Sequence, residues 1–217
     1  NDFVGVKCGI MDMFANLFGQ AKRVIKLDCR SLEFEYYPFE WEEIRVVISD
    51  SLVRRALATS EYNLRRQQCE AGVNLLKKYY PEIKSLRDVT VTRLVAHQTE
   101  LDPVVFKRCL YVIKENQRVE QACQDLLQRD LISFGQRMYE SHLGLRNEYE
   151  VSSRELDLLV ESAARVEGVY GSRMMGAGFG GCTISLMRSE AVKSFNERVL
   201  ADYREATGQE PAIHVRE

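Results

Sequence analysis

Residues 176–181, with the sequence Gly-Ala-Gly-Phe-Gly-Gly, carry the strongest chemical signal in this 217-residue chain. Gly176, Gly178 and Gly181 satisfy the G-x-G-x-x-G spacing of loops that cradle a dinucleotide pyrophosphate, but such loops require a helix directly after them. Here residues 182–187 alternate in polarity and predict a strand. We therefore interpret this glycine loop as a hairpin turn. Its bare backbone would either meet a neighbouring phosphate-binding loop or serve as a turn without a ligand.

The composition is that of an ordinary globular protein, with 45% hydrophobic and 29% charged residues. A net charge of -2 gives no electrostatic argument for nucleic acid, and no apolar run is long enough to span a bilayer, so neither partner is predicted. The cysteines form no C-x-x-C pair and the histidines no H-E-x-x-H motif. This pattern favours reduced thiols in a cytoplasmic protein without a zinc site.

The elements that would position the glycine loop follow from periodicity. Strands are predicted over 23–28, 32–39, 45–49, 169–171, 182–187 and 212–215. Helices are predicted over 10–18, 52–80, 119–127, 131–144, 156–167 and 192–207, the fifth after a capping box at 152–155, with short helices and loops over 85–115. The order indicates an α+β fold, a small, mostly antiparallel sheet covered on one face by helices. Residues 1–43 make too small a core alone, so we predict a remnant of another lobe there and a C-terminal lobe over 44–217.

Four stretches, in chain order, resemble the galactokinases. These enzymes belong to the family of small-molecule kinases that includes homoserine, mevalonate and phosphomevalonate kinases. The stretches are residues 3–12 with 27–32, residues 58–69, residues 141–157, and residues 168–174 running into the glycine loop. The resemblance covers essentially the whole chain. It implies a ferredoxin-like C-terminal lobe, and an activity that transfers the γ-phosphoryl group of ATP to the C1 hydroxyl of galactose with Mg²⁺.

The resemblance also implies that the chain is the C-terminal half of such a kinase. The family's sugar-recognition motif and its Gly- and Ser-rich phosphate loop do not occur in it, and the magnesium-ligating Glu would fall one place before Asn1. ATP and Mg²⁺ would then be bound mainly by the missing half, with no metal site in this chain. The chain alone is expected to be inactive. The absence of an initiator Met agrees with a chain cut from a longer protein.

Asp12, Gly9 and Tyr62 match the family's sugar-site residues. By the resemblance, Asp12 is catalytic and accepts the proton of the anomeric hydroxyl, Gly9 lets the backbone approach the sugar, and the Tyr62 hydroxyl contacts it. From the residues alone, Asp12 is a carboxylate favoured by a helix N-terminus and Gly9 is a flexible helix entry, while Tyr62 is as much a packing residue as a sugar contact.

The loop glycines are expected to support the phosphate loop of the other lobe and not to grip phosphate themselves. They are Gly176, Gly178, Gly180 and Gly181. A solvated basic face is expected for Arg54, Arg55, Arg65 and Arg66. Three departures from the family pattern, Met13, Asp50 and Met175, leave the sugar preference open. Two alternatives therefore remain: a non-catalytic sensor of galactose and ATP on the same fold, and an N-acetylgalactosamine kinase.

Overall fold

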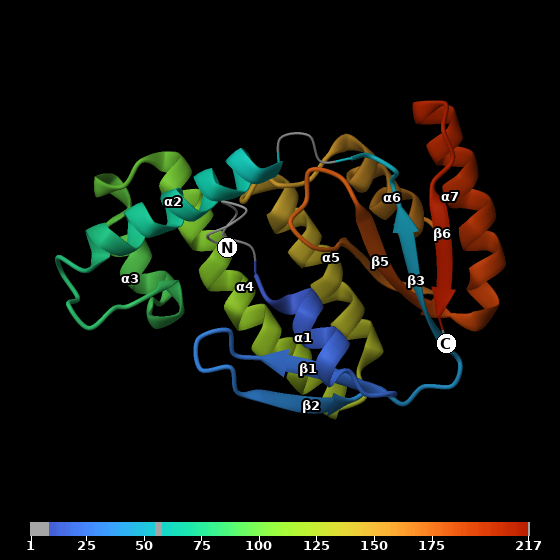
Figure 1. Ribbon diagram of the computed structural model, residues 1–217, viewed down its shortest axis with the longest axis horizontal. Coiled ribbons are helices and arrows are strands. Elements are labelled where there is room, and N and C mark those ends of the chain that lie inside the picture. The colour runs from blue at the N-terminus through green and yellow to red at the C-terminus, as the bar shows by residue number, and fades with distance from the viewer. Residues whose placement is uncertain (1–8, 55–57, 217) are drawn as a thin grey trace.

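The computed structural model describes residues 9–54 and 58–216 (Figure 1). The helices are α1 (Met11–Phe18), α2 (Ala58–Leu76), α3 (Val91–Ala96), α4 (Pro103–Leu127), α5 (Leu131–Asn147), α6 (Arg154–Ala164) and α7 (Val192–Thr207), with short 3₁₀ turns at Leu86–Asp88, Gln98–Glu100 and Ser189–Ala191. The strands are β1 (Arg23–Leu27), β2 (Phe34–Pro38), β3 (Ile44–Asp50), β4 (Val169–Met174), β5 (Cys182–Arg188) and β6 (Ala212–Arg216). In the described part of the chain, no helix is long and apolar enough to cross a membrane.

The main sheet has the strand order β4-β5-β3-β6, and every neighbouring pair is antiparallel. The apolar strand β3 is central, as its sequence predicts, and the order is that of a ferredoxin-like lobe. Helices α6 and α7 cover one face of the sheet, where Val47 and Met187 pack against Leu159, Phe195 and Tyr203. The predicted α+β fold is confirmed. In Figure 1 this sheet lies at the right and α2 and α3 at the left.

Helix α5 lies along the outer edge of β4. Glycines at the contact allow the two backbones to touch, because a Cβ on Gly135 would overlap the carbonyl oxygen of Tyr170. Farther along, the backbone N–H of Met174 donates to Nδ1 of the buried His142 at 3.2 Å. The helix thus covers an edge that would otherwise expose unpaired backbone groups. His142 has the structural role expected of a lone histidine.

Helix α1 lies on the β1–β2 hairpin through an aromatic cluster. Phe14 and Phe18 stack with ring centroids 4.4 Å apart, both contact Phe34, and the Tyr36 hydroxyl donates to the Phe18 carbonyl at 2.7 Å. The hairpin in turn packs on α4 and α5 through the small core around Tyr37. The division of the chain at residue 43 remains a prediction.

The predicted short helices and loops over 85–115 are only partly right. Short turns and α3 fill 86–100, but α4 starts at Pro103 and runs unbroken for 25 residues, so the apolar stripe from Val119 belongs to the same helix. Proline is well suited to the first position of a helix, where its missing N–H is not needed. Asp102 caps this helix by accepting from the N–H groups of Val104 and Val105.

Several predicted helix boundaries are also wrong. The helix predicted over 52–80 is described from Ala58 to Leu76, and residues 52–54 are not helical. Gly144 does not end α5 but lies inside it. The position requires glycine for a different reason, since a Cβ there would come 2.7 Å from the Tyr111 ring where α5 crosses α4. The N-cap of α6 is Ser153, whose hydroxyl accepts from the Leu156 N–H, and not Ser152. The Ser152 hydroxyl donates instead to the Asp157 carboxylate at 2.6 Å.

Candidate functional site

The glycine loop joins β4 to β5, as the sequence predicts, and the N–H of Met175 closes its base by donating to the carbonyl of Cys182 at 2.9 Å. A strand follows the loop, so it has no helix N-terminus with which to bind a pyrophosphate. Its backbone is largely left-handed, a region that favours glycine. The positive φ angles are 79° at Gly176, 85° at Gly178, 58° at Phe179, 123° at Gly180 and 84° at Gly181.

Two segments that are distant in the sequence, one at Val151 and one at Ser51 and Val53, hold the glycine loop by hydrogen bonds. The Phe179 N–H donates to the Val151 carbonyl at 2.7 Å, and the Gly181 N–H donates to the Val53 carbonyl at 3.3 Å. Both the N–H and the hydroxyl of Ser51 donate to the Gly181 carbonyl. A Cβ at Gly178 would overlap the Val151 oxygen, and one at Gly180 would lie 2.6 Å from the Val53 oxygen. The close approach therefore requires glycine at both positions.

Residues 148–151 form the first part of the connection between α5 and α6, and two arginines hold them by hydrogen bonds. Arg65 on α2 donates from Nε to the Tyr149 carbonyl at 2.8 Å and from a terminal nitrogen to the Glu150 carbonyl at 2.9 Å. Arg108 on α4 donates to the Glu148 carbonyl and, at 2.7 Å, to the Glu150 carboxylate. The Arg108 hydrogen bond holds the pKa of the Glu150 carboxyl below its usual range.

The solvated basic face predicted for four arginines is wrong for Arg65, which is only 7% exposed. Arg54 and Arg66 are exposed, the latter 3.5 Å from Glu70, and Arg55 lies outside the described residues. A signal for Arg65 did exist in the sequence. Arg65 lies seven, eight and eleven residues before the buried residues Gly72, Val73 and Leu76. These are helical spacings, so Arg65 belongs to the same inward face of α2.

Tyr62 is half-buried in α2 and lies near the same connection. Burial, with smaller electrostatic effects of Cys69 and Tyr62, raises the pKa of the Tyr149 hydroxyl well above its usual value. The Cys69 sulfur lies 3.9 Å from that hydroxyl. Tyr149 therefore remains neutral at physiological pH, and Tyr62 borders the group of residues that supports the glycine loop.

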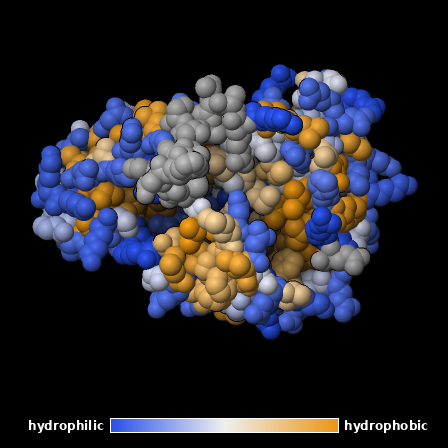
Figure 2. Space-filling view, viewed as in Figure 1, coloured by the Kyte–Doolittle hydropathy of each residue, from blue (hydrophilic) through white to orange (hydrophobic). Residues whose placement is uncertain are grey.

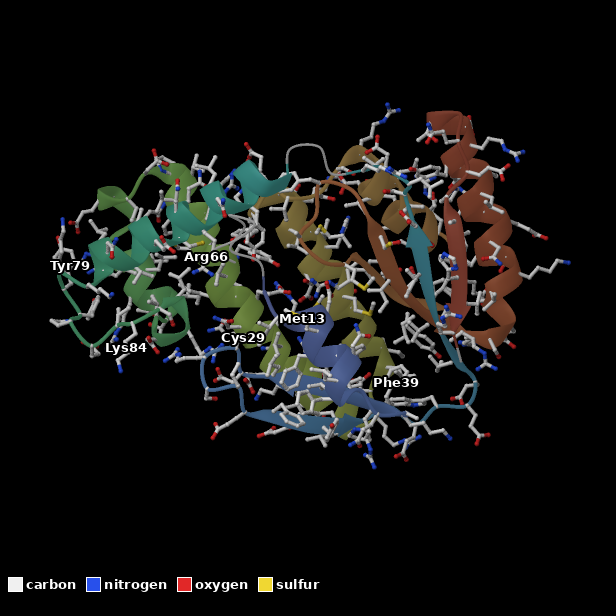
Figure 3. The ribbon with its side chains drawn as sticks, viewed as in Figure 1. Met13, Cys29, Phe39, Arg66, Tyr79 and Lys84 are labelled. Carbon is white, nitrogen blue, oxygen red and sulfur yellow. The ribbon has the colours of Figure 1, made fainter. Side chains whose placement is uncertain are left out.

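Asp12 is exposed in the first turn of α1, and Gly9 is exposed just before the helix. Within residues 9–54 and 58–216, no hydrogen bond links Asp12 to Tyr62 or to the glycine loop. The aromatic face of α1 rests on the hairpin and leaves its apolar outer face uncovered, with Met13 62% and Leu17 77% exposed. Figure 2 shows a hydrophobic patch in this region, and Figure 3 labels Met13 within it.

A pocket of about 400 Å³, which the sequence analysis missed, lies between the hairpin, α4, α5 and the sheet face opposite α6 and α7. Its wall is mostly apolar and includes Val46, Ile184 and Leu186. The charged side chains that line it have ion-pair partners. Glu115 contacts both Arg118 and Arg173, while Arg137 contacts Asp125 and Arg23 contacts Glu40 outside the pocket. The pocket therefore offers little free charge to a ligand.

The described residues offer no metal site. Within 9–54 and 58–216 there is no group of three or more His, Cys, Asp or Glu side chains that could hold a metal ion.

Comparison with known proteins shows what this chain is similar to. Residues 121–204 match the model of the GHMP kinases C terminal family. The chain is 44% identical over 215 residues to a galactokinase of Roseiflexus sp. (strain RS-1) and 40% identical over 216 residues to a galactokinase of Clostridium perfringens (strain SM101 / Type A). Each match covers 99% of the chain but only 55% and 56% of the relative, so the chain spans about half the length of these curated relatives.

A solved structure agrees along almost the whole chain. Lactococcus lactis galactokinase, crystallised with galactose, superposes with a TM-score of 0.92 at 35% identity, over 99% of this chain and 55% of that one. These matches show that residues 121–204 are similar to the GHMP kinases C terminal family, and that almost the whole chain is similar to about half of a galactokinase.

Proposed function

We propose that this chain is the C-terminal part of a galactokinase, which converts galactose and ATP to galactose 1-phosphate and ADP. The observation that carries the proposal is the similarity to galactokinases over 99% of the chain, at 44% identity in sequence and at a TM-score of 0.92 in structure. The Lactococcus lactis relative was crystallised with galactose, which supports this sugar as the substrate.

In the proposed reaction Asp12 accepts the proton of the C1 hydroxyl as that oxygen attacks the γ-phosphorus and ADP leaves. Gly9 lets the backbone approach the sugar, and the Tyr62 hydroxyl contacts it. A carboxylate can serve this reaction, because the loose transition state of phosphoryl transfer depends mainly on positioning and charge stabilisation. The exposure of Asp12 supports the proposal, since the carboxylate is open to a substrate bound by the rest of the protein.

The glycine loop has a supporting role in this proposal. The backbone at Gly176, Gly178, Gly180 and Gly181 would buttress the phosphate loop that holds ATP in the other half of the kinase. ATP, and the Mg²⁺ that neutralises its phosphates, would be bound mainly by that half. The chain alone is then inactive. A cytoplasmic location is proposed, in keeping with its scattered free cysteines.

A sugar panel with the complete protein tests this function, with ADP release as the readout. Release with galactose supports a galactokinase. Release with N-acetylgalactosamine alone would indicate the N-acetyl sugar kinase. Tight binding of galactose and ATP without ADP release would indicate a non-catalytic sensor. Either of the last two outcomes rejects the proposed activity.

A further inference from the structure

Two guanidinium groups are buried beside the 148–151 connection, where a charge is costly unless it is paired and hydrogen-bonded. The Arg65 residue is 7% exposed and Arg108 is 2% exposed. Between them they donate to three successive carbonyls, those of residues 148, 149 and 150. Their other hydrogen bonds go to the Glu61 carboxylate at 3.1 Å, to the Glu150 carboxylate at 2.7 Å and to the side-chain oxygen of Gln68 at 3.3 Å. The two arginines therefore hold this connection by its backbone.

The connection needs such support because its own conformation is unfavourable. Glu150 has a φ of 54°, in the left-handed region that non-glycine residues rarely adopt. Its backbone oxygen accepts from Arg65 and its carboxylate from Arg108, so both arginines stabilise the same strained residue.

The next carbonyl along the chain, that of Val151, is the one that accepts the Phe179 N–H of the glycine loop. The guanidinium of Arg65 also lies 5.9 Å from the centroid of the Phe179 ring, within reach of a cation–π interaction. The arginines thus bind the carbonyls of residues 148–150, while the carbonyl of Val151 binds the glycine loop. A shift of the connection would move the loop backbone with it, because Gly178 packs directly on the Val151 oxygen.

We propose that Arg65 and Arg108 are positioning residues for the glycine loop, acting through residues 148–151. The effect on catalysis rests on the proposed function, in which the loop supports the phosphate loop that binds ATP. The arginines do not touch substrate in this proposal. They fix the backbone on which the Phe179 N–H and the Gly178 Cα rest.

The test uses the complete protein with Arg65→Lys and Arg108→Lys, which keep the charge but lose the forked hydrogen bonds. Arg66→Lys is the matched control, since Arg66 is the exposed neighbour of Arg65. Amide hydrogen exchange is measured in peptides covering 148–151, 175–181 and, as an internal reference, α7. We expect exchange to rise about tenfold in the first two segments of each buried-site variant and to stay unchanged in α7 and in the control.

The kinetic readout separates positioning from general destabilisation. In the Arg65 and Arg108 variants the KM for ATP is expected to rise about tenfold, with the KM for galactose unchanged. Gly178→Ala, which disturbs the loop without touching either arginine, should reproduce this pattern. Unchanged exchange at 175–181 in both lysine variants, or equal increases in the two KM values, would overturn the proposal. If the wild-type protein releases no ADP with any sugar, the proposed function fails, but the exchange result still decides whether the arginines position the loop.

Discussion

Asp12 is the residue on which the proposed chemistry depends. Its carboxylate is exposed, so replacing it changes little of the packing of α1. We expect Asp12→Asn in the complete protein to lower kcat for ADP release about 10²- to 10⁴-fold, the usual loss when a positioned general base is removed. The thermal midpoint should be unchanged. Gln20→Ala, at an exposed position shortly after α1, is the control and should retain full activity. Full activity in Asp12→Asn would refute its assignment as the base.

At the same scale, Asp28 predicts a pH dependence. Hydrogen bonds from the Arg30 backbone N–H and from the Arg87 side chain lower the pKa of this carboxyl to about 2, from an ordinary value near 3.8. Because the folded pKa is the lower one, the ionised group stabilises the fold above about pH 4. That stabilisation is lost as the pH falls through about 2. The Arg87 contact joins the hairpin tip to the 3₁₀ turn at Leu86–Asp88.

The measurement is the thermal midpoint of wild type and Asp28→Asn between pH 7 and pH 2. Wild type should be the more stable at pH 7, and the difference should shrink between about pH 4 and pH 2. Glu42→Gln, an exposed substitution, is the control and should show no such pH-dependent difference. A difference in thermal midpoint that keeps its full size down to pH 2 would contradict the proposed link between the ionisation of Asp28 and stability.

At the scale of elements, the close crossing of α4 and α5 requires glycine at position 144, where a larger residue would not fit. A Cβ at Gly144 would lie 2.7 and 2.8 Å from two atoms of the Tyr111 ring, closer than atoms normally approach. We expect Gly144→Ala to lower the free energy of unfolding by about 1–3 kcal/mol through overpacking, despite the better helix propensity of alanine. Chemical denaturation measures this. Leu143→Ala, at the neighbouring position that is 51% exposed, should change the unfolding free energy by less than about 0.5 kcal/mol.

At the scale of the whole molecule, the chain spans about half the length of its curated relatives. It leaves apolar surface exposed on α1 and an apolar pocket between the hairpin, α4, α5 and the sheet. We expect the isolated chain to release no ADP from ATP above background with galactose, while the complete protein does. The same coupled assay, run at matched concentration, compares the two. Turnover by the chain alone would contradict the proposal that ATP is bound mainly by the other half.

The local elements and their types follow from patterns within the amino-acid sequence. Strands β3, β4, β5 and β6, helices α6 and α7, and the hairpin at the glycine loop all follow from period-2 or period-3.6 patterns, which each segment carries within its own residues. The ordered motifs also pointed to the galactokinase family, which the comparisons bear out. The roles of Gly9, Asp12 and Tyr62 stay predictions, because the contacts that would test them involve groups outside this chain.

The contacts between residues of different elements depend on how the elements pack in the folded chain. Arg65 looked solvated because its partners, the carbonyls of Tyr149 and Glu150, lie 84 and 85 positions away in the chain. Gly144 looked like a helix end because the Tyr111 ring that excludes a side chain comes from another helix. Periodicity reports which face of an element is buried, whereas the energy of a buried charge or of a close backbone approach depends on the groups packed against it.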